Sequence, residues 1–194
     1  MKKYKLTEET KKYYGITLYR IEALKDFGTV KAGDKGGFIR SEDNLAHEGN
    51  AWVGGSAWVY GSAWVYGSAC VYGNAQVEGN AQVGGDARVY GNARVGGNAQ
   101  VEGNAQVGGD ARVYGNARVE GNADIVQIGP IGSRNDITTF FRGQENGISV
   151  RCGRFCGTID EFAEAVKKTH GGTKYEKEYM AAIAVARAHI DGNE

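Results

Sequence analysis

The side chains best suited to binding an anion are gathered near the C-terminus of this 194-residue sequence. Glycine, serine and arginine are the residue types that hold phosphate, through backbone N–H groups, a hydroxyl and a bidentate guanidinium. No phosphate motif of fixed spacing is present, so a solvated loop with ordinary surface arginines is the alternative. The candidate ligand-binding residues are Ser133, Arg134, Asn135, Asp136, Arg142, Arg151 and Arg154.

Two cysteines and a histidine in the same region suggest a zinc site. Cys152 and Cys156 have metal-ligand spacing and His170 follows, but a fourth ligand is missing. Thiols buried in a small core are therefore favoured over a metal centre. We expect neither a metal nor a cofactor.

The elements that position these residues begin with an array of repeats. Thirteen hexads of the form Gly-[Asn/Asp/Ser]-Ala-x-[Val/Ile]-x run from Gly49 to Val126. Alternate side chains of a strand share a face, so the alanine and the aliphatic residue of each hexad point to one interior. Glycine followed by a short polar residue supplies a corner. Three hexads close a coil of 18 residues, which gives about four and a third stacked coils.

Residues 73–96 and 97–120 form a tandem duplication of 24 residues that differs only at its last position. Because 24 residues make one and a third coils, the copy is displaced by one face and equivalent residues do not stack. A ligand surface on the coils would be scrambled by this displacement. The duplicated region is interpreted as a spacer or scaffold.

The repeats resemble the left-handed parallel β-helix, or hexapeptide-repeat, family. Val-Tyr-Gly-Asn-Ala-Arg at positions 89–94 matches the family pattern residue for residue. The resemblance implies left-handed winding and a homotrimer. It also extends to uncharacterised bacterial and phage hexapeptide-repeat proteins, through the segment 31–39 before the array and Gly132–Asp136 after it.

Acyl transfer is the best-known activity of this family, and it requires a histidine base. The array contains no histidine, so it supplies neither that base nor the three ligands of a carbonic-anhydrase-like zinc site. His47 lies in the entry turn and is interpreted as a packing or surface residue. We therefore expect no enzymatic activity.

The fold class predicted is mainly β: a left-handed parallel β-helix solenoid at 43–126, an N-terminal β cap at 1–42 and a C-terminal α+β domain at 127–194. The cap is expected because a solenoid exposes an apolar end. Leu45 fits an incomplete first hexad, with its side chain pointing inward. In the C-terminal domain, alternation predicts a β-hairpin of 137–142 and 147–152 around the turn 143–146. Helices are predicted from the capping box Thr158–Glu161 to Gly171, and over 174–190, with Phe162 and Tyr179 on their apolar faces.

Exposed aromatic residues are expected to form a belt around the first full coil. Aromatics at this density mark a contact surface, either between subunits or beneath the N-terminal segment. The belt consists of Trp52, Trp58, Trp64, Tyr60, Tyr66 and Tyr72.

Composition limits the compartments and partners. Basic and acidic residues number 23 each, and no segment is basic enough to favour nucleic acid. No apolar stretch reaches membrane-spanning length, and the first residues lack the apolar core of a secretory signal. Three cysteines, an odd number, indicate reduced thiols in a cytoplasm.

These features together predict an oligomeric, non-enzymatic binding protein. Its C-terminal domains would sequester a small anionic, nucleotide-like ligand between them, as a phage-encoded sponge would in a host cytoplasm. A structural scaffold that binds a protein partner is the alternative. An acyltransferase-like enzyme is the third interpretation.

Overall fold

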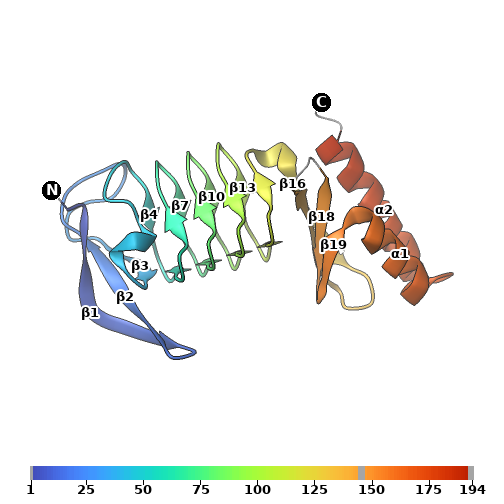
Figure 1. Cartoon of the computed structure of the whole chain (residues 1–194), viewed down its shortest axis with the longest axis horizontal. Helices are drawn as coiled ribbons and strands as arrows, with labels where there is room; N and C mark the ends of the chain where they lie inside the picture. Colours follow the sequence, from blue (N-terminus) through green and yellow to red (C-terminus); the bar gives the residue numbers. More distant parts are fainter. Residues whose placement is uncertain (1, 144–146, 192–194) are drawn as a thin grey trace.

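The computed structural model describes residues 2–143 and 147–191. Figure 1 shows an N-terminal cap, a solenoid of stacked coils, and a β-sheet at the far end of the coils with two helices beyond it. The chain is thus a mainly β protein built around a parallel β-solenoid, as the hexads predict.

Twelve hexads each contribute one two-residue strand to the solenoid. The strands are β4 (Trp52–Val53), β5 (Trp58–Val59), β6 (Trp64–Val65), β7 (Cys70–Val71), β8 (Gln76–Val77), β9 (Gln82–Val83), β10 (Arg88–Val89), β11 (Arg94–Val95), β12 (Gln100–Val101), β13 (Gln106–Val107), β14 (Arg112–Val113) and β15 (Arg118–Val119). The thirteenth hexad departs from the pattern: it forms the 3-10 helix η2 (Asn122–Asp124) and starts the long strand β16.

Strands three hexads apart lie on top of one another. One face is β4-β7-β10-β13, another is β6-β9-β12-β15, and the third is β5-β8-β11-β14 within a seven-stranded sheet. Arg88 pairs with Gln106 rather than with its duplicate Arg112, so duplicated residues do not stack. The valines of the twelve strands are fully buried, and so are the alanines of these hexads, with Ala117 at 1% exposure. This apolar interior stabilises the coils.

The first glycine of each of the first twelve hexads has a left-handed backbone that other residues adopt with strain. Gly61, for example, has φ 72°, and a β-carbon there would approach the carbonyl oxygen of Gly79 in the next coil to 2.9 Å. Close stacking of the coils therefore requires glycine at this corner position.

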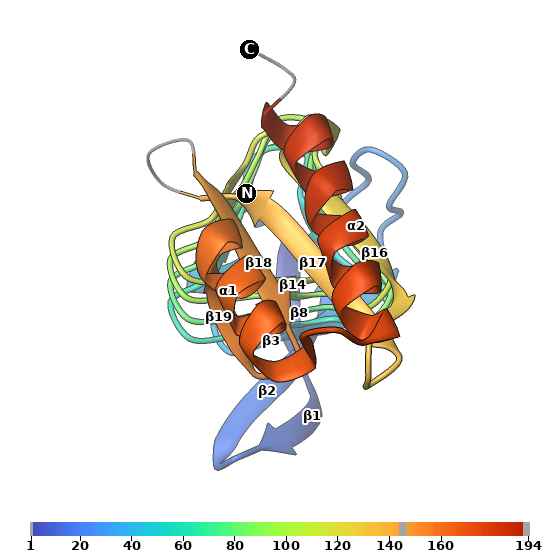
Figure 2. The same ribbon diagram turned by 90° about the vertical axis from the view of Figure 1, so that its right-hand side faces the viewer.

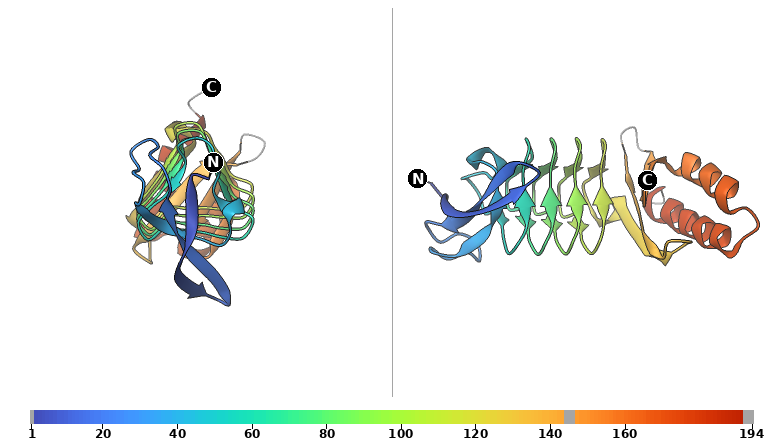
Figure 3. Two further views of the ribbon diagram at one scale, coloured as in Figure 1. Left: turned by 90° about the vertical axis from the view of Figure 1, so that its left-hand side faces the viewer. Right: turned by 90° about the horizontal axis from the view of Figure 1, so that it is seen from below.

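The N-terminal cap consists of β1 (Tyr4–Tyr13), β2 (Ile16–Ala23), β3 (Lys35–Ile39) and the 3-10 helix η1 (Glu42–Asn44). The strands extend one solenoid face in the order β1-β2-β3-β5, and the β1-β2 hairpin projects beside the coils (Figure 3). Leu45 is 1% exposed in the solenoid core and forms a bridge with Val65, which confirms its predicted inward position.

Beyond the coils lies an antiparallel sheet of β16 (Ile125–Ile131), β17 (Asp136–Arg142), β18 (Ile148–Cys152) and β19 (Phe155–Thr158). The helices α1 (Ile159–His170) and α2 (Lys174–Ile190) cover its outer face (Figure 2). The predicted hairpin corresponds to β17 and β18, while its turn lies partly outside the described residues. Between the array and this hairpin, β16 continues to Ile131, and residues 132–135 form the turn that leads into β17. The strand β19 was not predicted by alternation.

Neighbouring phenylalanines join this sheet to both of its sides. Phe141 belongs to the solenoid core, whereas Phe140 packs with Phe162 and Tyr179 of the helices. Successive strand residues point to opposite faces, so one strand serves two cores. The C-terminal unit is therefore the lid of the solenoid as well as a helical layer.

The two solenoid ends require opposite capping groups. Apart from the bonds inside the strand ladders, N–H groups of one coil donate to carbonyl oxygens of the next, as from Trp52 to Ala69. Carbonyl groups at the N-terminal end therefore need donors, and the cap supplies them. The Asn44 amide donates to the carbonyl oxygens of Gly61 (3.3 Å) and Ala63 (2.8 Å), and the buried Lys3 ammonium donates to that of Ala51 (2.7 Å).

At the other end, N–H groups such as those of Gln106 and Arg112 have no further coil to donate to, and side chains of residues 122–139 supply oxygen acceptors. Asn122 Oδ1 accepts from Gln106 N at 2.9 Å, and Thr139 Oγ1 accepts from Arg112 N at 3.3 Å. Each end thus has side chains of the polarity that its backbone requires.

Tyrosines on the coils reach across glycines to distant glutamates. Tyr66 passes over Gly84 and donates to Glu102 Oε1 at 2.5 Å, two coils away. Tyr114 passes over Gly96 and donates to Glu78 Oε1 at 3.1 Å. In each bridge the glycine lies in the coil between the tyrosine and its glutamate.

Replacing Gly84 by alanine is expected to lower the free energy of unfolding by about 1–2 kcal/mol. The new β-carbon would occupy the position of the Tyr66 ring and break its bond to Glu102, and hydrogen bonds to charged groups contribute about 1.5–3 kcal/mol. Denaturant unfolding measures the loss. In a double-mutant cycle with Tyr66→Phe, additive losses would contradict a shared cause.

The same tyrosines should make the protein sensitive to alkali. Burial, and next the glutamate carboxylates, raise the pKa of Tyr66 and of Tyr114 to about 12. Because the folded state favours the neutral phenols, their contribution is complete below pH 10 and is lost as the pH rises through about 12. A double Tyr66→Phe, Tyr114→Phe variant should lose less stability than the wild type over this range, measured by denaturant unfolding. Parallel curves would contradict this prediction.

Among the described residues, neither helix is long and apolar enough to cross a membrane.

Candidate functional site

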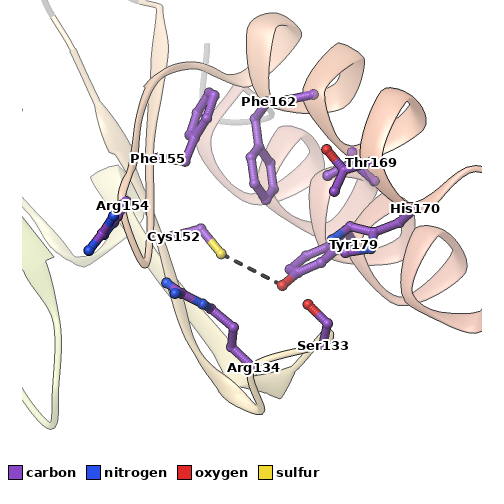
Figure 4. Close-up of a pocket in the computed structure, with 11 residues that line it drawn as sticks. Ser133, Arg134, Cys152, Arg154, Phe155, Phe162, Thr169, His170 and Tyr179 are labelled. Carbon is purple, nitrogen blue, oxygen red and sulfur yellow. Dashed lines mark hydrogen bonds between the residues drawn. The ribbon is translucent and has the colours of Figure 1, made fainter.

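A cavity of about 370 Å³ lies in the C-terminal unit, between the sheet, α1 and α2. The turn after β16 contributes Ser133 and Arg134, and the β18-β19 hairpin contributes Cys152 and Arg154. The helices contribute Phe162, Thr169, His170 and Tyr179. Figure 4 shows Ser133, Arg134, Cys152 and Tyr179 directed toward one space, with Phe155 and Phe162 as an aromatic wall.

The turn that carries Ser133 and Arg134 is fixed by hydrogen bonds and by glycine. Gly132 N donates to Glu178 Oε2 of α2 at 2.7 Å, and Asn135 N donates to Gly132 O at 3.1 Å. A β-carbon on Gly132 would collide with the phenol of Tyr179. Glycine therefore lets the turn lie directly on α2, which brings Arg134 to the cavity.

The cavity floor is a chain of weak donors. Thr138 Oγ1 donates to Cys152 Sγ at 3.3 Å, and Cys152 Sγ in turn donates to Tyr179 Oη at 3.8 Å. Burial, and next the neighbouring Cys152, raise the pKa of Tyr179 to about 12, so this phenol is protonated at neutral pH. It can donate a hydrogen bond to a ligand.

Positive charge at the cavity is not neutralised. Within residues 2–143 and 147–191, no hydrogen bond or ion pair holds the guanidinium group of Arg134 or Arg154. Arg134 lies against Gly153, close enough that a β-carbon there would meet its Nη1 at 2.6 Å. Arg154 lies at the edge of the cavity (Figure 4). An anion would find one guanidinium inside and one at the rim.

The structure thus brings together three of the seven predicted binding residues: Ser133, Arg134 and Arg154. Arg142 instead donates to Asp124 Oδ1 (2.7 Å) and to the Ile190 carbonyl (2.6 Å), where it ties α2 to η2. Arg151 lies over the Tyr114 ring, on the solenoid side of the sheet. Residues of opposite strand faces cannot share one cavity.

The remaining two predicted residues shape the turn. Asn135 has φ 51° in the left-handed region, and Asp136 Oδ1 accepts from Ile137 N at 2.8 Å. The aromatic side chains that line the cavity were missed, because helical periodicity assigned Phe162 and Tyr179 to the core. The adjacency of Arg154 and Phe155 was the available signal.

The cysteines do not form the predicted buried pair. Cys152 is half-buried in the cavity, whereas Cys156 is exposed, so the expectation of two buried thiols is wrong for Cys156. Cys152 pairs with Phe155, the residue before Cys156, and successive residues of a strand point to opposite faces. The two thiols therefore lie on opposite faces of the sheet. No cluster of three or more His, Cys, Asp or Glu suited to a metal occurs within the described part of the chain.

His47 is held in the N-terminal cap. Its ring stacks on Tyr4, its Nδ1 accepts from Lys3 N at 3.2 Å, and its Nε2 lies 3.4 Å from Glu42 Oε2. Both ring nitrogens are engaged within the cap. This agrees with a packing role.

The N-terminal segment covers only part of the aromatic belt. Trp52 packs against Phe27 and Tyr4, and Trp58 packs against Tyr13. Tyr60 is buried by the same hairpin and donates to Glu78 Oε2 at 2.5 Å. Trp64, 42% exposed and stacked on Tyr66, and Tyr72, 41% exposed, remain at the surface.

Comparison with known proteins identifies the repeats. Residues 81–97, 87–103 and 111–123 match the family described as YdcK Beta solenoid repeat. The chain is also similar to the uncharacterized acetyltransferase YdcK of Escherichia coli (strain K12), with 39% identity over 61 residues. The match covers 27% of this chain and only 19% of the E. coli protein. The similarity therefore concerns a segment of both proteins.

Proposed function

We propose that the protein is a non-enzymatic binding protein whose C-terminal cavity takes a small anionic ligand with an aromatic ring, such as a mononucleotide. The unpaired Arg134 beside an aromatic wall is the observation that carries this proposal. Its guanidinium would pair with the anionic group, and Phe155 and Phe162 would contact the ring. A volume of about 370 Å³ lies in the usual range of small-molecule sites.

The ligand would lie inside one C-terminal domain, and not in a cleft between several of them as the sequence predicts. The solenoid would then hold the cavity away from the N-terminal cap, as a scaffold. Sequestration, rather than turnover, fits a site whose Cys152 and Tyr179 interact with each other.

Thermal-shift measurements with nucleoside monophosphates and the corresponding nucleosides test the proposal. Stabilisation by the phosphates is expected, because a ligand at 100 times its Kd adds about 2.7 kcal/mol. Arg134→Gln should weaken binding about tenfold or more, since charge-assisted hydrogen bonds contribute about 1.5–3 kcal/mol. Arg118→Gln, an exposed solenoid arginine, is the matched control and should bind normally. Equal behaviour of the two variants, or no stabilisation at all, would refute the proposal.

Acyl transfer is a second candidate, because the E. coli relative is named an acetyltransferase. His47 beside Glu42 is the arrangement that could provide a base. Its Nδ1 already accepts the backbone N–H of Lys3, so we place this function second. Acetyl-coenzyme A hydrolysis that is abolished in a folded His47→Gln variant would reverse the order.

Assembly into a homo-oligomer is a further part of the proposal, with a trimer favoured by the family resemblance. The exposed Trp64 stacked on Tyr66 supports a contact on the face of β6, β9, β12 and β15. Light scattering should show a smaller mass for Trp64→Ala than for the wild type. A monomeric wild type would contradict the assembly.

A further inference from the structure

A second cavity, of about 450 Å³, lies where the N-terminal cap meets the solenoid. It is distinct from the C-terminal cavity. Its walls come from the cap loop at Thr29, from the first coil at Asn50 and Trp52, and from the next coils at Tyr72 and Arg88.

The position of this cavity follows from the pattern of tyrosines and glycines along the coils. At Gly84, Gly96 and Gly108 a tyrosine ring of a neighbouring coil fills the space that a side chain would occupy. At Gly54 no tyrosine ring does so: a β-carbon there would be in ordinary contact with Trp52 Cδ1 at 3.5 Å, Trp52 Nε1 at 3.7 Å and Tyr72 Cβ at 3.8 Å. Tyr72 in the coil above stacks on Tyr90, with ring centroids 5.4 Å apart and planes at 12°. Its other face is left to the open position beside Gly54.

The polar groups around this position are uncommitted. In the two other corner columns, side chains bond to one another, from Asn74 to Asn92 and from Asn80 to Asn98. In the part of the chain that the structure describes, no hydrogen bond engages the side chains of Thr29, Asn50, Trp52, Ser68 or Arg88. One ring-sized space is thus surrounded by five available polar groups.

The cavity also has a positive field. Arg88 is the charged lining residue, and no carboxylate is among the lining residues. The buried Lys3 ammonium is a second cation. Burial raises the pKa of the Cys70 thiol that lines the cavity, and the positive charges of Arg88 and Lys3 both oppose this rise. A ligand with a negative charge is therefore favoured over a neutral one.

We propose that this cavity binds a pyranose sugar that carries a carboxylate, a uronic acid. Its C–H face would stack on Tyr72, because aromatic faces attract the partial positive charge of C–H groups. Its hydroxyls would bond to Asn50, Ser68 and Trp52 Nε1, and its carboxylate to Arg88. A flat nucleobase presents polar atoms only at its edge and would use fewer of these groups.

Saturation-transfer NMR with methyl glucuronide and methyl glucoside tests the proposal on the whole protein. The glucuronide should bind, and the glucoside should bind about tenfold more weakly, because it lacks the carboxylate that pairs with Arg88. Arg88→Gln should abolish this preference. Absence of binding by either sugar, or equal binding of both to the wild type, would overturn the proposal.

A blocking variant locates the site. Gly54→Tyr adds the tyrosine that Tyr60 and Tyr66 show to be compatible with this position of the hexad, so the chain should fold as before. Circular dichroism checks that fold. The added ring would fill the space below Tyr72 and should abolish glucuronide binding. Gln100→Tyr adds the same ring on a different solenoid face, away from the cavity and from Arg88, and should leave binding intact. Undiminished binding to a folded Gly54→Tyr variant would refute the assignment.

Discussion

Replacing Asn44 by aspartate is expected to lower the free energy of unfolding by about 3 kcal/mol, although the two side chains have almost the same shape. The Asn44 amide is buried and donates to two carbonyl groups of the first coil. A carboxylate would keep the bonds that Asn44 Oδ1 accepts from the N–H groups of Arg40 and Ser41, but its second oxygen would turn an acceptor toward these two carbonyl acceptors. Removing the partner of a buried charge costs about 3–5 kcal/mol, and the two remaining bonds place the expected loss at the lower end of this range.

The pH and the companion variants separate this mechanism from a loss of packing. Protonation of the new carboxyl restores an O–H donor, so the penalty of Asn44→Asp should shrink at acidic pH. Asn44→Ala should cost less, about 1–3 kcal/mol, because it removes the donors without adding charge. Asn122→Asp should be nearly neutral, since Asn122 serves as an acceptor at the opposite end. A large loss in Asn122→Asp, or no pH dependence in Asn44→Asp, would count against the polarity of the two ends. Denaturant unfolding of the three variants, with Asn44→Asp measured at both neutral and acidic pH, gives the four free energies needed.

Phe141→Ala is expected to destabilise the fold by about 3–5 kcal/mol, the usual cost of removing a buried phenylalanine side chain. Phe141 is 1% exposed and closes the apolar interior of the solenoid from above. Its loss would open the last coil to water. Hydrogen exchange should therefore increase at β13, β14 and β15.

Phe140→Ala is the matched variant, since Phe140 is equally buried but faces α1 and α2. Its stability loss should be similar, but the increased exchange should appear in the helices. If both variants increased exchange in the same elements, the sheet would not separate two cores.

The sequence predicts the coils well because their interior repeats. Val53 and its successors specify a face, a period and a stacking distance, and nothing outside the hexad is needed. The tyrosine bridges were not predicted. Coils of three hexads place Tyr66, Gly84 and Glu102 in one column, but the hexad pattern does not specify that the tyrosine side chain lies along this column. The same holds for Asn44, whose partner atoms belong to the backbone of another coil.

The C-terminal cavity could be predicted only in part. Ser133 and Arg134 were identified from residue type, and their turn does reach the cavity. The error at Arg151 arose because Arg151 and Arg154 cannot be distinguished by residue type. Only one face of the sheet borders the helices, and Arg151 points to the other face, where it contacts Tyr114. Tyr179 was assigned to a core face correctly, but that face is also the wall of the cavity.

The duplication of four hexads gives the molecule a built-in way to change its geometry. One more copy would lengthen the axis by one and a third coil spacings, about 6 Å, and would turn the C-terminal unit by about 120° relative to the N-terminal cap. Three added copies in total would restore the original orientation at greater separation. The length of the solenoid and the rotation of the C-terminal unit relative to the N-terminal cap therefore change together. Genetic duplication can reach only certain combinations of the two.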